Sequence, residues 1–192
     1  MEGAKAVMAE VRRKCFISYH HADQLEVSRF VRTFDHTHNT FISRGLGQEM
    51  TDELINSTNT DYVMRRIREL YLRDSTVTLV MLGNCTWARR YVDWEIQASL
   101  RRGESVTPNG LLAIKLPSFR PGTAFPERLN ANLTSAEDRA KGMDYRYAAH
   151  IPYPQTLEVL TSAIEAAYQR RYTHAKNIVN YRTRFSYNRR CP

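Results

Sequence analysis

Hydrophobic positions along the chain fall into short runs that are separated by stretches of helical spacing. The short runs, which predict buried strands, are residues 15–18, 40–43, 76–82, 111–116 and 149–151. Between them, apolar residues recur at helical intervals and predict helices over about 24–36 and 60–72, from about 86 onward, and over 156–170. Strands that alternate with helices are typical of a parallel sheet with helices on both faces. The pattern therefore predicts an α/β fold around a parallel sheet of about five strands.

Two polar stretches interrupt this alternation. Residues 44–59 carry Gly45 and Gly47 and predict a loop with room for one helical turn. Residues 118–142 carry Pro121, Gly122 and Pro126 and predict a long loop with a short helical piece. Loops of this length often form part of the rim of a functional site.

One acid is conspicuous on the helix that follows the third predicted strand. Trp87, Tyr91 and Glu95 are spaced i, i+4 and i+8, so a continuous helix would place them on one face. Gly83 lets the chain turn from the strand toward this helix. A carboxylate near aromatic rings at the carboxyl edge of a parallel sheet suits a cationic or sugar-bearing ligand. The same pattern also fits an ordinary core helix with a solvated acid.

The first predicted strand runs directly into a polar motif, KCFISYHHAD, at residues 14–23. The chain here resembles the TIR domain, and four residues match the pattern F-x-S-[YF]-x-x-x-D: Phe16, Ser18, Tyr19 and Asp23. TIR domains that cleave NAD also carry a glutamate four residues after an aromatic residue, usually tryptophan, on the helix after the third strand. Tyr91 and Glu95 occupy these positions, and Tyr91 departs from the usual tryptophan.

A closer similarity is to the TIR-like proteins of the bacterial Thoeris antiphage system, over most of the chain. The shared features are His20 after the serine-aromatic pair, the polar run at 75–78, the sequence TWARRYVDWEI at 86–96 and the Leu-Pro turn after 111–116. The resemblance implies a flavodoxin-like or TIR-like three-layer fold, with helices on both faces of the central sheet.

The same resemblance implies an enzyme that converts NAD to nicotinamide and an ADP-ribose-derived, cyclised signal. Glu95 would be the catalytic residue, because a carboxylate can stabilise the oxocarbenium-like ribose that forms when the bond to nicotinamide breaks. The substrate-binding residues that it implies are Phe16, Ser18, Tyr19, His20, Asp23, Gly83, Tyr91 and Trp94.

NAD would be the substrate, so no cofactor is expected. The other expected partners are further copies of the chain in a homo-oligomer, a separate effector reached through the diffusible product, and a phage-derived trigger. A non-catalytic TIR-like adaptor, which only assembles with other TIR domains, remains an alternative.

The net charge of +8, with a pI of about 9.6, raises nucleic-acid binding as another alternative. Residues 170–190 interleave arginines with Tyr172, Tyr181, Phe185 and Tyr187. This pattern suits stacking on nucleic acid, packing of an extra helix and strand on the domain, or a place in an oligomer interface. We expect packing rather than nucleic-acid binding. The expected organisation is an N-terminal extension (1–13), a TIR-like domain (14–170) and a basic aromatic C-terminal extension (171–192) packed on that domain.

The three cysteines, Cys15, Cys85 and Cys191, are far apart and form no CxxC pair, which predicts a reducing compartment and no structural zinc. Cys85 is expected to be a small buried residue at a strand end rather than a reactive thiol. His20 and His21 are neighbours on an extended segment and point opposite ways, so no metal site is expected. Without an apolar run of membrane-spanning length or a signal-peptide pattern, we expect no membrane contact and a cytoplasmic location.

Overall fold

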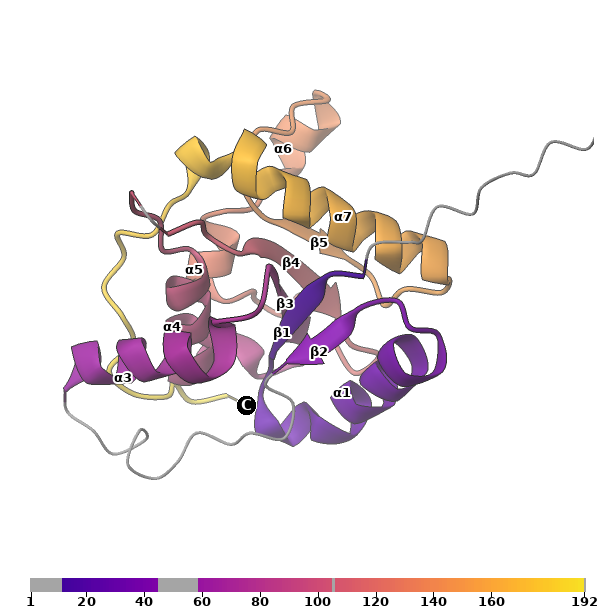
Figure 1. The fold of residues 1–192 in the computed structure, drawn as a ribbon, viewed down its shortest axis with the longest axis horizontal. Helices are drawn as coiled ribbons and strands as arrows, with labels where there is room; N and C mark the ends of the chain where they lie inside the picture. The colour runs from indigo at the N-terminus through magenta and orange to yellow at the C-terminus, as the bar shows by residue number, and fades with distance from the viewer. Residues whose placement is uncertain (1–11, 45–58, 105, 192) are drawn as a thin grey trace, which may run out of the picture.

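The computed structural model describes residues 12–44, 59–104 and 106–191. Most of the predicted N-terminal extension, and residues 45–58 of the predicted glycine-bearing loop, lie outside the described residues. Five parallel strands form one sheet in the order β2-β1-β3-β4-β5 (Figure 1). In chain order they are β1 (Lys14–Ser18), β2 (Ile42–Arg44), β3 (Val77–Leu82), β4 (Gly110–Lys115) and β5 (Ala149–Ile151). This order is that of flavodoxin-like folds, so the predicted fold class is confirmed.

Helices cover both faces of the sheet (Figure 1). On one face lie α1 (Gln24–Val31) and α7 (Leu157–Thr173), and on the other lie α3 (Thr60–Ile67), α4 (Arg90–Ser99) and α5 (Glu127–Asn130). π-Helical turns at Arg32–Thr37 and Arg68–Leu72 extend α1 and α3 to about the predicted lengths. Short 3₁₀ turns occur at His21–Asp23, Thr86–Ala88 and Ala175–Asn177. The predicted loop at 118–142 contains α5 and a second short helix, α6 (Ala136–Ala140).

Alternate residues of each strand contribute to opposite layers of the core, as the two-residue period of a strand requires. In β1, Cys15 and Ile17 pack with the α1 and α7 side chains, whereas Phe16 packs with α3 and α4. Ser18 lies two residues after Phe16, so it faces the same layer as Phe16. The first strand therefore directs the Ser18 hydroxyl toward α4.

After α7 the chain runs back across the α4 and α5 side of the molecule (Figure 1). Residues 178–191, which we call the C-terminal strap, have no regular secondary structure and make hydrogen bonds to both helices. Two of its arginines, Arg182 and Arg189, form ion pairs with Glu127 at the start of α5. These two cations are therefore engaged within the molecule.

The structure corrects the expectation for the cysteines. Cys85, which follows β3, and Cys191, at the end of the C-terminal strap, form a disulfide with a Cα–Cα distance of 5.6 Å. Cys15 is a buried free thiol. The inference of a reducing compartment rested on cysteines without partners, so it loses its basis. The pairing was hidden because the two residues are 106 positions apart and meet only when the strap returns to the sheet.

Across the described ranges, no helix combines the length and the apolar character needed to cross a lipid bilayer.

Candidate active site

The candidate site lies where β1 and β3 end and α4 begins. In this strand order the chain passes from β1 to β2 on one side and from β3 to β4 on the other side, so its direction across the sheet reverses between β1 and β3. Ligands of such sheets bind at this point, beyond the carboxyl ends of the strands. Ser18 is the last residue of β1, and Gly83 directly follows β3. Both residues are thus placed at this edge by the paired register of β1 and β3.

The structure brings Ser18 and Glu95 into direct contact. The Ser18 Oγ donates a hydrogen bond to Glu95 Oε2 at 2.6 Å. Ser18 is fully buried, and the Glu95 side chain is only partly exposed. Burial raises the pKa of Glu95 from its ordinary value of 4.5 to about 8, although the Ser18 hydrogen bond acts in the opposite direction. Carboxyl groups whose pKa is raised toward neutral pH occur often at functional sites of proteins.

A network of buried hydroxyl and amide groups links the backbone carbonyl of Glu95 to β3. Ser99 Oγ donates to the Glu95 carbonyl at 2.8 Å and lies 2.7 Å from Thr78 Oγ1 on β3. The Asn109 amide donates to Thr78 Oγ1 at 3.3 Å and to Ser75 Oγ at 2.7 Å. These supporting residues were not predicted from the sequence. Their only signal was that polar side chains occur at positions of the strand and helix that should be buried.

Asp23 and Gly83 also lie side by side. Thr86 Oγ1 accepts a hydrogen bond from the Gly83 N–H at 2.8 Å and lies 3.5 Å from Asp23 Oδ2. A Cβ at position 83 would lie 2.1 Å from Asp23 Oδ2, so any other residue there would force this carboxylate to move. Burial, followed by the nearby charge of Glu26, raises the pKa of Asp23. Thr86 is a further site residue that the sequence did not reveal.

His20 lies almost entirely inside the protein, whereas His21 is exposed. Burial, together with the nearby charges of Arg89 and His21, lowers the pKa of His20 to about 4. The imidazole of His20 is therefore neutral at pH 7. Arg89 also acts on the pKa of Asp23, so a guanidinium group that was not among the predicted residues lies near both side chains. Across the described ranges, no three His, Cys, Asp or Glu side chains gather closely enough to hold a metal ion.

The four aromatic residues predicted to line the site lie in two different layers of the fold and differ in their exposure. Phe16 and Trp94 are 2% and 4% exposed, and they pack together with α3 in the core, so neither offers a ring face to a ligand. Tyr19 packs on the opposite side of the sheet with the α1 and α7 layer, and its hydroxyl donates to Gln24. Tyr91 is partly buried one helical turn before Glu95, with its ring centroid 5.5 Å from that of Trp94.

The predicted face of Trp87, Tyr91 and Glu95 is wrong for Trp87. Arg89 has an extended backbone (φ −97°, ψ 120°), so the 3₁₀ turn that contains Trp87 is separate from α4, which begins at Arg90. The i, i+4 spacing therefore holds only between Tyr91 and Glu95.

A cavity of about 390 Å³ lies at the other end of the sheet. Its walls include Asp144, His150 and Arg170 and otherwise come from β5, α7 and the segment before β5. None of the residues at the Glu95 site contributes to this cavity.

A family model described as Thoeris protein ThsB, TIR-like domain, matches residues 16–120. The match covers more than half of the chain and includes Ser18, Asp23, Gly83 and Glu95. No curated protein matches the chain.

Proposed function

Because the chain belongs to the Thoeris ThsB family, whose TIR-like domain implies a role in antiphage defence, we propose that it cleaves NAD. The products would be nicotinamide and an ADP-ribose-derived signal. The observation that carries the proposal is the largely buried Glu95 carboxyl group, which is hydrogen-bonded to Ser18 at the carboxyl edge of the sheet.

Glu95 would act on the ribose carbon that carries nicotinamide. When that carbon–nitrogen bond breaks, its electron pair leaves with nicotinamide, and positive charge develops on the ribose. A carboxylate held within a poorly solvated site stabilises this charge more strongly than water does. The nicotinamide ring of NAD is itself cationic, so its arrival would favour the ionised form of a carboxyl group whose pKa is about 8. Ser18 would keep the carboxylate in one orientation.

The remaining groups suit the rest of the substrate. Arg89 supplies a positive charge near His20 and Asp23, and it would attract the pyrophosphate of NAD. Tyr91 is the aromatic residue best placed for a base or nicotinamide ring, because it is not completely buried and lies one turn from Glu95. Which nucleophile captures the ribosyl cation decides whether the product is linear or cyclised. A cyclised product would then act on a separate effector.

The direct test is to incubate the purified chain at high concentration with NAD and to follow nicotinamide by chromatography, with Glu95→Gln beside it. We expect release by the wild type and loss of release in the variant. Glu165→Gln is the matched control, because Glu165 is a partly exposed acid on α7, remote from Glu95, and the same atoms are changed. Release by all three proteins would contradict a role for Glu95.

If none of the three proteins releases nicotinamide, even when lysate from phage-infected cells is added to supply a trigger, the result would contradict NAD cleavage. That result would favour the non-catalytic adaptor.

A further inference from the structure

The C-terminal strap lies along one stripe of α4, the helix that carries Glu95. The helix positions that hold it are Arg90, Asp93, Trp94 and Gln97, which follow the i, i+3, i+4, i+7 spacing of a single helix face. The Arg90 N–H donates to Asn188 Oδ1 at 3.0 Å, and the Trp94 indole N–H donates to the Phe185 carbonyl at 2.9 Å. Asn180 Nδ2 donates to the Gln97 carbonyl at 3.0 Å.

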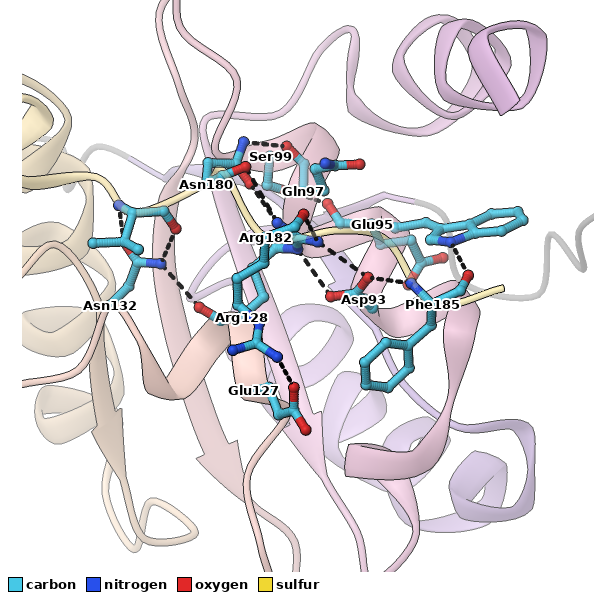
Figure 2. Close-up of polar contacts among 12 residues, drawn as sticks. Asp93, Glu95, Gln97, Ser99, Glu127, Arg128, Asn132, Asn180, Arg182 and Phe185 are labelled. Carbon is cyan, nitrogen blue, oxygen red and sulfur yellow. Dashed lines mark hydrogen bonds and ion pairs between the residues drawn. The ribbon is translucent and has the colours of Figure 1, made fainter. Parts of the chain in front are cut away.

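Arg128 on α5 joins this face to the strap (Figure 2). Its Nε and Nη2 donate to the two carboxylate oxygens of Asp93 at 2.9 and 3.2 Å. Its Nη1 donates to Asn180 Oδ1 at 3.1 Å, and its Nη2 donates to the Arg182 carbonyl at 3.0 Å. The Phe185 N–H supplies a further donor to Asp93 Oδ2 at 3.1 Å.

Arg128 is completely buried, and Asp93 is only 4% exposed. A buried ion pair is stable only where its remaining hydrogen-bonding groups are satisfied, and here the strap supplies those partners. Without the strap, the guanidinium of Arg128 would lose its bonds to Asn180 and Arg182, and Asp93 would lose the bond from Phe185. The strap and the ion pair therefore depend on each other.

The far end of the strap is attached to the segment just before α4. The Arg189 N–H donates to the Ala88 carbonyl at 2.8 Å, and the Cys85–Cys191 disulfide closes the strap next to the end of β3. The strap thus contacts α4 along its length and the β3–α4 connection at its end. The opposite side of α4 is held to β3 by Ser99 and Thr78.

We propose that the C-terminal strap, anchored by Arg128, is a positioning element that holds α4 at the distance where Glu95 meets Ser18. The effect on catalysis rests on the proposed NAD cleavage, whereas the effect on α4 does not. Arg128 is a positioning residue in this arrangement, because it acts on Glu95 through Asp93 and the helix. It and the strap lie outside residues 16–120, which the family model matches.

The first measurement is hydrogen–deuterium exchange of the α4 amides in the complete chain without NAD. We expect these amides to exchange about tenfold faster or more in Arg128→Met and in Asn180→Ala, because both lose bonds between strap and helix. Arg182→Ala is the matched control. It removes the exposed ion pair with Glu127 but keeps the backbone carbonyl that accepts from Arg128, so α4 should exchange as in the wild type.

The second measurement is nicotinamide release by the same proteins. We expect kcat to fall about 10- to 100-fold in Arg128→Met, with little change in KM, because a displaced carboxylate affects the reaction more than binding. Arg128→Lys keeps one charge beside Asp93 and should recover part of the loss. If Arg128→Met does not fold, Asn180→Ala carries both measurements.

The outcomes separate the two proposals. A wild type that releases no nicotinamide contradicts NAD cleavage, yet the exchange of α4 still tests the strap. Unchanged α4 exchange in folded Arg128→Met or Asn180→Ala overturns the positioning role. Faster exchange of α4 with unchanged kcat in an active enzyme shows that the strap holds the helix but does not position Glu95, which also overturns the proposal.

Discussion

Replacing Glu95 by glutamine should make the protein more stable, and increasingly so as the pH rises. In the folded protein Glu95 releases its proton near pH 8, whereas in the unfolded chain it does so near its ordinary pKa of 4.5. Between these values the folded state holds a proton that the unfolded state has lost. The free energy of unfolding therefore falls as the pH rises through this window, and the stabilisation is fully present only below about pH 4.5.

The size of this effect follows from the two pKa values. Their difference of about 3.5, at about 1.4 kcal/mol for each pH unit, sets an upper bound of about 5 kcal/mol. The side chain is partly exposed, and water that reaches the carboxylate reduces the cost of its charge, so we expect about 2–4 kcal/mol. Glutamine has no ionisable proton, and its amide oxygen can still accept from Ser18. The variant should thus match the wild type near pH 4.5 and exceed it in stability by this amount above pH 8.

The assay is urea unfolding followed by circular dichroism, at several pH values between about 4.5 and 9, without reductant so that the disulfide stays intact. Taking the difference between variant and wild type at each pH cancels the titration of all other groups. Glu165→Gln is a control with the opposite sign. The hydrogen bond and charge of Arg13 lower the pKa of Glu165, so its stabilisation is present at neutral pH and is lost as the pH falls. A difference in the free energy of unfolding between Glu95→Gln and the wild type that does not change with pH would refute the reasoning.

Three further outcomes are expected. Ser18→Ala removes the hydrogen bond that lowers the pKa of Glu95, so the acid limb of nicotinamide release against pH should move to higher pH, and an unmoved limb would contradict the contact. Gly83→Ala places a Cβ 2.1 Å from Asp23 Oδ2, the end of a flexible side chain that can rotate away, so it should displace this carboxylate but change the free energy of unfolding in urea by only about 1 kcal/mol or less. Cys191→Ser opens a cross-link between residues 106 positions apart and should cost about 2–4 kcal/mol in the same assay. Reductant should lower the stability of the wild type similarly and leave Cys191→Ser unchanged, and a reductant effect on both would point away from this disulfide.

The strands were predictable because each has a local signature. β3 is a run of six buried residues, and β1 and β4 are nearly as apolar, which is typical of strands covered on both faces. The position of Glu95 on the helix after β3 was equally local. The separation of Ser18 from Tyr19 could also have been read from the chain, because neighbouring residues of a strand point to opposite faces. The continuous helix face from Trp87 failed because only the backbone of Arg89 shows where α4 begins.

Other parts of the site had no signature that could be read locally. Arg128 lies in a segment rich in proline and polar residues, so its sequence environment is that of an exposed loop, yet its side chain is completely buried against Asp93. Cys85 and Cys191 are joined across more than half of the chain. Each of these pairings depends on where two distant segments come to lie, and the spacing of residues within either segment carries no information about it.

Apolar and polar spacing thus settled which segments become strands and helices, because burial of one face is a requirement that each segment records in its own residues. It also placed Ser18 at the end of the first strand and Glu95 on the helix after the third strand. Tertiary structure alone decided that the side chains of Ser18 and Glu95 meet at 2.6 Å. It also decided that the C-terminal strap and Arg128 hold α4 from the side opposite Ser18. Hydrogen bonds and ion pairs act over about 3 Å, so their partners are chosen only once packing has brought the elements together.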